Sequence, residues 1–340
     1  MVGRLLAHHL ERICGREDRP FEVLSLGASN PLPQPVALHG FSRVRLVTSI
    51  LRRQLAPRAR RGVWLYDLLG LARAQALCPR VPYAVMLYGI EVWRPLAAGA
   101  RRALEHASLP IAISRATVEG SRPFTSRLVG ATVLPLTLEG RAPQGSIDAT
   151  ALERAGDGFA LIVGRMDAGE RYKGHEELLL SLARPEARAV RLVVAGGGDD
   201  RERLERRAAE TGVGERACFL GFVSENTLAA LYERCALLAM PSRGEGFGLV
   251  YLEAMRSGKP VLAALGGAAE EVVVDGETGR LVDPADTAAL ARALAELTSD
   301  QALAARYGAA GRSRFAETFS AQRFEDRLAE VVRELDRCAA

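Results

Sequence analysis

Residues 236–260 constrain the fold of this 340-residue chain more than any other stretch. An apolar run at 236–240 predicts a short buried strand, and Pro241 ends it. Three glycines follow within a short loop, and apolar residues then recur at helical spacing up to Gly258. A strand, a glycine loop and a helix in this order form an anion site, because the free N–H groups and the dipole at the helix start attract negative charge.

Two carboxylates in this stretch lie eight residues apart, Glu245 in the loop and Glu253 in the helix. A carboxylate beside a phosphate would repel it, so we expect both to accept hydrogen bonds from sugar or ribose hydroxyls. For either glutamate alone, a capping or solvated role is the simpler interpretation. The glycines, the helix start and both acids together favour a binding site.

The stretch resembles the Glu-x7-Glu motif of retaining glycosyltransferases with the two-domain GT-B fold (glycosyltransferase family 4, group 1 type). That family includes glycogen and sucrose-phosphate synthases. The resemblance implies that Glu245 faces the donor sugar and that Glu253 holds the ribose of a sugar nucleotide. It extends from about residue 158 to residue 282, with weaker matches upstream.

A basic pair of the family is matched by Arg165, after the expected strand 159–163, and by Lys173, before the next helix. Two cations beside a departing diphosphate would stabilise the charge that grows on it. A solvated loop arginine is the alternative for Arg165, and we expect His175 to be a helix-start residue rather than a general base. The resemblance implies further donor contacts from Gly164, Phe222, Val223, Gly246, Phe247, Gly248 and Leu249.

On the expected acceptor side, Gly89 and Glu91 resemble the His-Gly-x-Glu/Asp loop of the family. Tyr88 stands where many relatives have histidine, although its hydroxyl can still donate a hydrogen bond. Ser114 and Arg115 follow a further predicted strand, and we expect them to contact the acceptor.

The predicted fold class is α/β, because strands alternate with helices throughout the chain. We expect two doubly wound, parallel-sheet (Rossmann-like) domains that face a cleft. Residues 1–145 would form an acceptor-side domain, to which a helix at 318–340 crosses back, and residues 146–317 would bind the nucleotide sugar. Residues 139–158 are polar, without periodicity, and are predicted to be the interdomain linker.

Charge is distributed unevenly between the two predicted domains. Residues 1–145 hold 20 arginines, no lysine and 9 acidic residues, while the rest of the chain is net acidic. Residues 41–61 alone carry seven arginines beside a helical apolar side. This segment is either a core-packed helix with a solvated basic face or a surface for anionic lipid or an anionic acceptor. No aromatic residues interleave it, which argues against nucleic acid.

Several classes of protein are not favoured by the sequence. It has no apolar run of about 18 residues, which a spanning helix needs, and no signal peptide. Its five cysteines are scattered without metal-ligand spacing. From these features we expect a cytoplasmic protein, or one that is peripheral at the inner face of the membrane.

No Asp-x-Asp metal motif is evident in the sequence. We also expect no metal cofactor, with Arg165, Lys173 and the helix start in the place of the metal.

The function that the resemblance implies is transfer of a hexose, with retention, from a GDP- or UDP-hexose to a glycan or lipid-linked acceptor. One alternative is a non-catalytic sugar-nucleotide-binding protein or a truncated glycosyltransferase; a sugar-nucleotide epimerase is a third. Relatives begin with a strand and a Gly-Gly loop, whereas residues 3–10 already read as the first helix. We therefore expect the first domain to lack its first strand, either because Met1 is an internal methionine or because the protein is degenerate.

Overall fold

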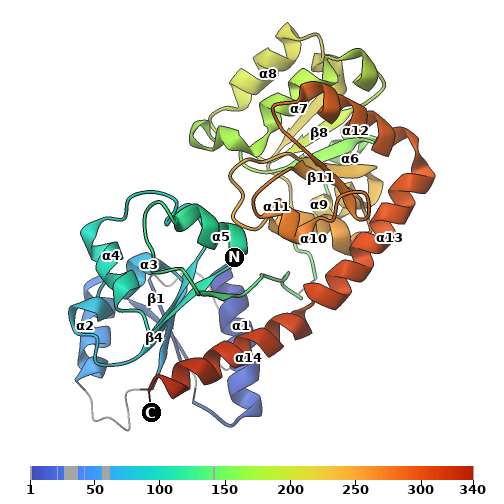
Figure 1. The fold of residues 1–340 in the computed structure, drawn as a ribbon. Coiled ribbons are helices and arrows are strands. Elements are labelled where there is room, and N and C mark those ends of the chain that lie inside the picture. The colour runs from blue at the N-terminus through green and yellow to red at the C-terminus, as the bar shows by residue number, and fades with distance from the viewer. Residues whose placement is uncertain are drawn as a thin grey trace. The chain divides into compact units, whose positions relative to one another are not determined.

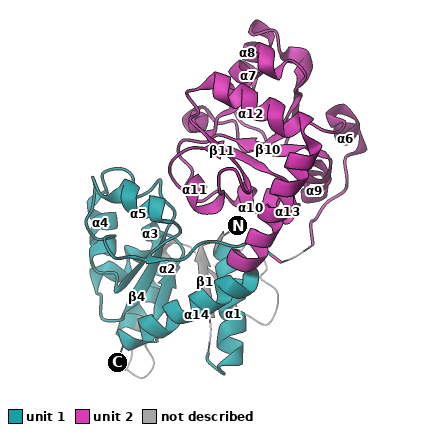
Figure 2. Cartoon of the chain, turned by 45° about the vertical axis from the view of Figure 1, so that its right-hand side comes forward, with its two compact units in different colours: residues 1–139, 321–340 teal, residues 140–320 magenta. Residues whose placement is uncertain are grey.

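The computed structural model describes residues 2–20, 22–26, 37–41, 43–55, 62–140 and 142–339. The chain forms two compact units (Figure 2). Unit 1 comprises residues 1–139 and 321–340, and unit 2 comprises residues 140–320. The sequence predicts these divisions at 145/146 and 317/318.

Unit 2 is built on a six-stranded parallel sheet with the order β12-β11-β10-β7-β8-β9. The order of the strands reverses between β7 and β10, which is the switch point where doubly wound sheets bind ligands beyond the strands' carboxyl ends. The strands are β7 (Ala160–Val163), β8 (Leu192–Ala195), β9 (Ala217–Gly221), β10 (Leu237–Met240), β11 (Val261–Ala264) and β12 (Gly279–Val282).

Helices cover this sheet, as Figure 1 shows. Buried side chains of α7, α8 and α12, among them Leu179, Leu204 and Leu294, pack in one core with those of β7 and β8. The helices are α6 (Ala149–Ala155), α7 (His175–Leu182), α8 (Arg201–Glu210), α9 (Glu225–Arg234), α10 (Leu249–Arg256), α11 (Ala269–Val272), α12 (Thr287–Ser299) and α13 (Gln301–Thr318), with 3-10 turns η3 (Ala168–Lys173), η4 (Pro185–Ala187) and η5 (Gly214–Arg216).

Helix α6 lies inside the segment 139–158 that the sequence predicts as a linker, so that prediction is wrong for residues 149–155. The Asp148 side chain caps the helix by accepting a hydrogen bond from the N–H of Ala151 at 3.0 Å. The Leu152 side chain is buried. A capping acid and a few small buried residues are enough to form a helix that has no extended apolar periodicity.

Unit 1 is also α/β, with parallel strand pairs throughout its described residues. Four strands form a sheet in the order β3-β4-β5-β6, and β1 pairs with β2 in a separate sheet. The strands are β1 (Glu22–Leu26), β2 (Ala37–Phe41), β3 (Trp64–Tyr66), β4 (Tyr83–Leu87), β5 (Leu109–Ala112) and β6 (Thr132–Val133).

The last helix of the chain returns to unit 1 and packs against the first (Figures 1 and 2). Glu325 is buried there, and its Oε1 lies 2.8 Å from Nδ1 of His9. The helices are α1 (Val2–Arg16), α2 (Arg43–Gln54), α3 (Leu69–Ala72), α4 (Ala98–Glu105), α5 (Arg115–Ser121) and α14 (Ala321–Arg337), with a 3-10 turn η2 (Gln75–Leu77).

Helix α2 lies within the basic segment 41–61. Its Leu46 and Ile50 are buried in the core of unit 1, and Arg52 is exposed. Three arginines of the segment, at 58, 60 and 61, lie outside the described residues. No helix in the described part of the chain combines the length and apolar character that a membrane crossing requires.

Candidate functional site

The predicted donor residues lie at the carboxyl ends of neighbouring unit 2 strands. Gly164 follows β7, and its N–H donates to the Ala195 carbonyl oxygen at the end of β8 at 3.0 Å. The N–H of Gly196 donates in turn to the carbonyl oxygen of Gly221, at the end of β9, at 2.8 Å. The three strand ends are therefore linked by backbone hydrogen bonds into one surface.

The two cations of the predicted basic pair meet on a single carboxylate, that of Glu170. Nζ of Lys173 lies 2.7 Å from Oε2 of Glu170, and the Arg165 guanidinium donates to Oε1 of the same group. The Lys173 ammonium is largely buried, with 13% of its side chain exposed, whereas 66% of the Arg165 side chain is exposed. Arg165 and Lys173, which are eight residues apart in the sequence, therefore lie close together in the structure.

Glu245 belongs to the same group of charges. Burial raises the pKa of its carboxyl, the nearby Lys173 lowers that pKa, and Glu170 raises it. The neighbouring Tyr172 has a pKa raised to about 12, first by burial and then by Glu170 and Glu245. Glu245 therefore lies within electrostatic range of Lys173 and Glu170 although it follows a different strand.

Close packing of two loops brings Lys173 to the end of β10. Gly174 has a φ of 90°, and a Cβ atom there would lie 2.7 Å from Cγ of Pro241. Glycine allows both the left-handed backbone and this approach. The N–H of Arg243 also donates to the carbonyl oxygen of Tyr172 at 2.9 Å, so the loops on either side of the site are joined.

Helix α10 begins at this site without a side-chain cap. Its N-cap, Gly248, has φ 88° and ψ 68°. A Cβ atom on Gly248 would lie 2.3 Å from the ring of Tyr251, so only glycine fits. Because the first N–H groups of a helix lack intrahelical acceptors, they provide a site for an anion.

Glu253 lies one helical turn further along α10, in a partly buried position. Burial raises the pKa of its carboxyl, while the hydrogen bond from Tyr232 lowers it. Oη of Tyr232 donates to Oε2 of Glu253 at 2.8 Å.

The remaining donor-side candidates differ in exposure. The Phe222 side chain is 91% exposed beyond the end of β9, and Val223 is half-buried. The Phe247 side chain is buried, and its ring centroid lies 5.9 Å from that of Phe319. The Phe247 side chain therefore packs in the core. Gly246 and Leu249, close to it in the sequence, are partly exposed.

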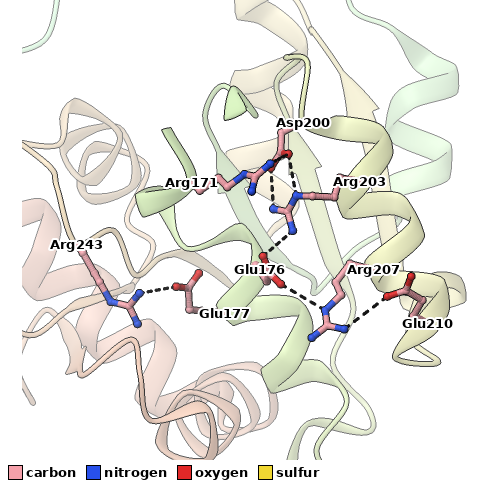
Figure 3. Close-up of polar contacts among 8 residues, drawn as sticks. All are labelled: Arg171, Glu176, Glu177, Asp200, Arg203, Arg207, Glu210 and Arg243. Atoms are coloured by element: carbon pink, nitrogen blue, oxygen red, sulfur yellow. Dashed lines mark hydrogen bonds and ion pairs between the residues drawn. The ribbon is translucent and has the colours of Figure 1, made fainter. Parts of the chain in front are cut away.

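A network of ion pairs braces the elements that carry the basic pair, and Figure 3 shows it. Asp200, at the start of α8, accepts from Arg171 of η3 at 2.9 Å and from both ends of the Arg203 guanidinium. Arg203 also donates to Glu176 of α7 at 2.7 Å. Hydrogen bonding to Arg203, more than any other cause, lowers the pKa of Asp200. The backbone around Lys173 is thus tied to two helices.

In unit 1 the structure places Tyr88, Gly89 and Glu91 at the end of β4. The Tyr88 hydroxyl donates to Oδ1 of Asp67, and the Tyr88 N–H donates to Oε1 of Glu91 at 2.5 Å. Burial, followed by the charge of Asp67, raises the pKa of Tyr88, so the hydroxyl stays protonated at neutral pH.

The two predicted acceptor residues after β5 have different environments. Ser114 is buried and acts as the N-cap of α5, where its Oγ accepts from the N–H of Thr117 at 2.9 Å. Arg115 is exposed as the first residue of that helix. Ser114 therefore has a structural task that is independent of any ligand.

Three residues of these clusters were not predicted from the sequence: Asp67, Glu170 and Tyr232. Asp67 directly follows β3, so its place at a carboxyl strand end is a signal that could have been used. Glu170 lies between the two cations in sequence, and an acid between two basic residues is a weaker signal. Tyr232 is 21 residues from Glu253, and nothing in the local pattern links the two.

Comparison with known proteins places unit 2 in a family. Residues 146–314 match the family described as glycosyl transferases group 1. These residues therefore belong to that family. The match includes Arg165, Lys173, Glu245 and Glu253, so the four residues of the candidate donor site all lie within the family region.

Curated relatives match part of the length of this chain. It is 35% identical over 202 residues to a GDP-mannose-dependent α-(1-6)-phosphatidylinositol monomannoside mannosyltransferase of Mycolicibacterium smegmatis, covering 56% of this chain and 52% of the relative. It is 41% identical over 142 residues to a D-inositol 3-phosphate glycosyltransferase of Streptomyces avermitilis, covering 40% of this chain and 30% of the relative. The matched regions thus span about half of the relatives' length or less.

Solved structures confirm the predicted fold class. HepE from Anabaena, in complex with UDP and glucose, superposes with a TM-score of 0.76 at 21% identity, over 96% of this chain and 95% of that one. Sucrose-phosphate synthase from Thermosynechococcus elongatus gives a TM-score of 0.71, also at 21% identity, over 97% and 92% of the two chains. The chain therefore has the GT-B fold, with two parallel-sheet units.

Proposed function

We propose that this protein is a retaining glycosyltransferase that transfers a hexose from a nucleoside-diphosphate sugar. The observation that carries the proposal is the meeting of Arg165 and Lys173 on Glu170 at the carboxyl ends of the unit 2 strands, with Glu245 within electrostatic range of Lys173. Two cations and one partly buried carboxylate, beside a helix start, match the needs of a sugar linked to a diphosphate.

In this proposal the diphosphate binds to the start of α10 and to the two cations. It takes the place of Glu170 as the partner of Arg165 and Lys173, which are already held close together by that carboxylate. As the bond between sugar and diphosphate breaks, negative charge grows on the leaving group. Fixed cations and helix N–H groups stabilise this charge more in the transition state than in the ground state. We propose that they do so without a metal ion.

The two glutamates bind hydroxyl groups in this proposal. Glu245, close to Lys173, accepts hydrogen bonds from the donor sugar. Glu253, on the second turn of α10, accepts them from the ribose. The acceptor hydroxyl attacks on the face from which the diphosphate departs, and a donor phosphate oxygen takes its proton. The chain then needs no side-chain nucleophile.

The names of the relatives bear on the donor and the acceptor. One relative is named as GDP-mannose-dependent, and one structural neighbour was solved with UDP and glucose, so we propose a GDP- or UDP-hexose as donor. The relatives are named for acceptors that contain phosphatidylinositol or inositol phosphate. The excess of arginine in residues 1–145 suits an anionic acceptor of this kind, either a glycan or a lipid-linked sugar.

Peripheral contact with an anionic membrane is a further part of the proposal. Helix α2 has Leu46 and Ile50 buried in unit 1, which supports a core-packed helix. The exposed Arg52 and the other arginines of residues 41–61 remain as a candidate basic surface for lipid headgroups.

A non-catalytic nucleotide-binding protein is the second candidate function. It is favoured by the tyrosine at position 88, whose hydroxyl is engaged by Asp67. Incubation of the protein with labelled GDP-mannose and UDP-glucose separates the two functions. A transferase releases nucleoside diphosphate slowly even without acceptor and faster when a suitable acceptor is present, whereas a binder releases none. Absence of release with either donor, despite tight binding, would contradict the proposed transfer.

A further inference from the structure

We propose that Tyr232 is a positioning residue, which orients the Glu253 carboxylate so that it can bind the two ribose hydroxyls of a nucleotide. The proposal rests on the function proposed above, because it assigns a partner to a residue of that donor site. Tyr232 itself is 3% exposed and lies too deep in unit 2 to be a ligand contact.

The geometry joins two helices that follow one another along the chain. Tyr232 is on α9 and Glu253 is on α10, and the strand β10 and the glycine loop lie between these helices in sequence. Oη of Tyr232 lies 2.8 Å from Oε2 of Glu253 and at the weaker distance of 3.5 Å from the carbonyl oxygen of Val250. A phenol has a single proton to donate, so this donor is directed at the carboxylate.

A buried ring has little freedom to move, and a hydrogen bond from it therefore fixes the torsion angle of the carboxylate. Oε2 of Glu253 is engaged by Tyr232, while Oε1 accepts no hydrogen bond from any described residue. One carboxylate oxygen is thus held by the protein, and the other is available for a ligand. Pre-orientation of this kind strengthens binding because less side-chain freedom is lost when the ligand arrives.

The same bond acts on the charge of Glu253. Burial raises the pKa of Glu253, and the Tyr232 hydroxyl and the nearby Arg256 lower it, while Glu225 raises it. The ionised carboxylate is an acceptor at both oxygens, whereas protonation turns one oxygen into a donor and leaves fewer sites for ribose hydroxyls. Loss of the Tyr232 hydroxyl should therefore impair ribose binding, and more so as the pH falls.

The test uses the full chain with Tyr232→Phe and compares ribonucleotides with probes that lack the ribose hydroxyls. Affinities for GDP and UDP, and for their 2′,3′-dideoxy forms, are measured by titration calorimetry. We expect Y232F to lose about tenfold in affinity for the ribonucleotide that wild type prefers, the scale of one hydrogen bond to a charged group. Its affinity for the dideoxy form should not change. Ionisation of the phosphates affects both affinities alike, so it cancels in their ratio. As the pH is lowered, the preference for the ribonucleotide should therefore begin to fall at a higher pH in Y232F than in wild type.

Tyr251→Phe is the matched control. Tyr251 is fully buried on α10, and its hydroxyl donates to the carbonyl oxygen of Met240 at 3.0 Å rather than to a carboxylate. This variant loses a buried tyrosine hydroxyl close to the site, and it should keep the wild-type preference for ribose. A double variant, Y232F with Glu253→Gln, should show no further loss of that preference beyond E253Q alone.

The outcomes separate the two proposals. Equal losses for ribose and dideoxy probes in Y232F, or an unchanged preference for ribose, would overturn the role of Tyr232 and leave the donor site intact. A further loss in the double variant would also overturn it, since Tyr232 would then act by another route. If wild type binds neither GDP nor UDP, the proposed function itself fails, and this inference fails with it.

Discussion

Glu245 and Glu253 are both partly buried, but their neighbours give them different expected roles. Glu245 lies close to Lys173 and Glu170, whereas Glu253 is bonded to Tyr232. We predict that Glu245→Ala mainly lowers the rate of transfer, because the sugar loses its hydrogen bonds in the transition state. Glu253→Ala should mainly weaken nucleotide binding. Measurement of kcat and of the dissociation constant for free GDP or UDP checks this; wild-type values of both in either variant would argue against the motif.

His175 provides a prediction on pH at the same scale. Burial lowers its pKa to about 4, with Lys173 lowering it further and Asp200 opposing this effect. Its Nε2 is buried and has no hydrogen-bond partner among the described residues. The unfolded chain, with a histidine pKa near 6.5, therefore binds more protons than the folded chain between about pH 6.5 and 4.

Stability should consequently fall as the pH drops through this window, by at most about 3 kcal/mol from His175. We predict that His175→Leu shows a shallower loss of unfolding free energy between pH 7 and pH 4.5 than wild type. Urea unfolding at several pH values measures this. An identical pH dependence in the two proteins would show that His175 is not the titrating group.

At the scale of elements, sequence reasoning succeeded where local pattern decides the structure. The predicted strand at 236–240 and the helix from near Gly248 to Gly258 correspond to β10 and α10. Helix α6 was missed for a physical reason. It depends on a cap from Asp148 and on small buried residues, which leave no extended apolar periodicity in the sequence.

Helix α2 and the basic segment around it carry a prediction on lipid binding. We predict that the protein binds vesicles containing anionic lipid and that added salt weakens this binding, because screening reduces the attraction. Substitution of Arg52, Arg53, Arg60 and Arg61 by glutamate should abolish it. Sedimentation with anionic vesicles, and with zwitterionic vesicles as control, measures the effect. Undiminished binding by the fourfold variant would remove this surface from the account.

At the scale of the whole molecule, the α/β class and the parallel sheets could be predicted because apolar strands alternate with helices along the sequence. The contacts that complete the candidate site could not be predicted in the same way. The bonds from Tyr232 to Glu253 and from Tyr88 to Asp67 join residues 21 positions apart, and each depends on how separate elements pack. Local sequence patterns predict where the strands end, whereas tertiary packing determines which side chains form hydrogen bonds with the site residues.

The central claim is that Arg165 and Lys173 stabilise the departing diphosphate. The chain offers a matched control, because Lys259 is its only other lysine. Nζ of Lys259 donates to the carbonyl oxygens of Glu233 and Cys235, both at 2.8 Å, and so it caps the end of α9. Lys259→Ala removes the same charge and should affect stability rather than turnover.

The most direct measurement is turnover of the preferred labelled sugar nucleotide by wild type, Lys173→Ala, Arg165→Ala and Lys259→Ala. We predict that K173A and R165A each lose about 10²-fold or more in kcat, the scale seen when one transition-state donor is removed. The folded K259A protein should turn over at nearly the wild-type rate. Wild-type turnover in K173A or R165A, or an equal loss in all three variants, would contradict the account.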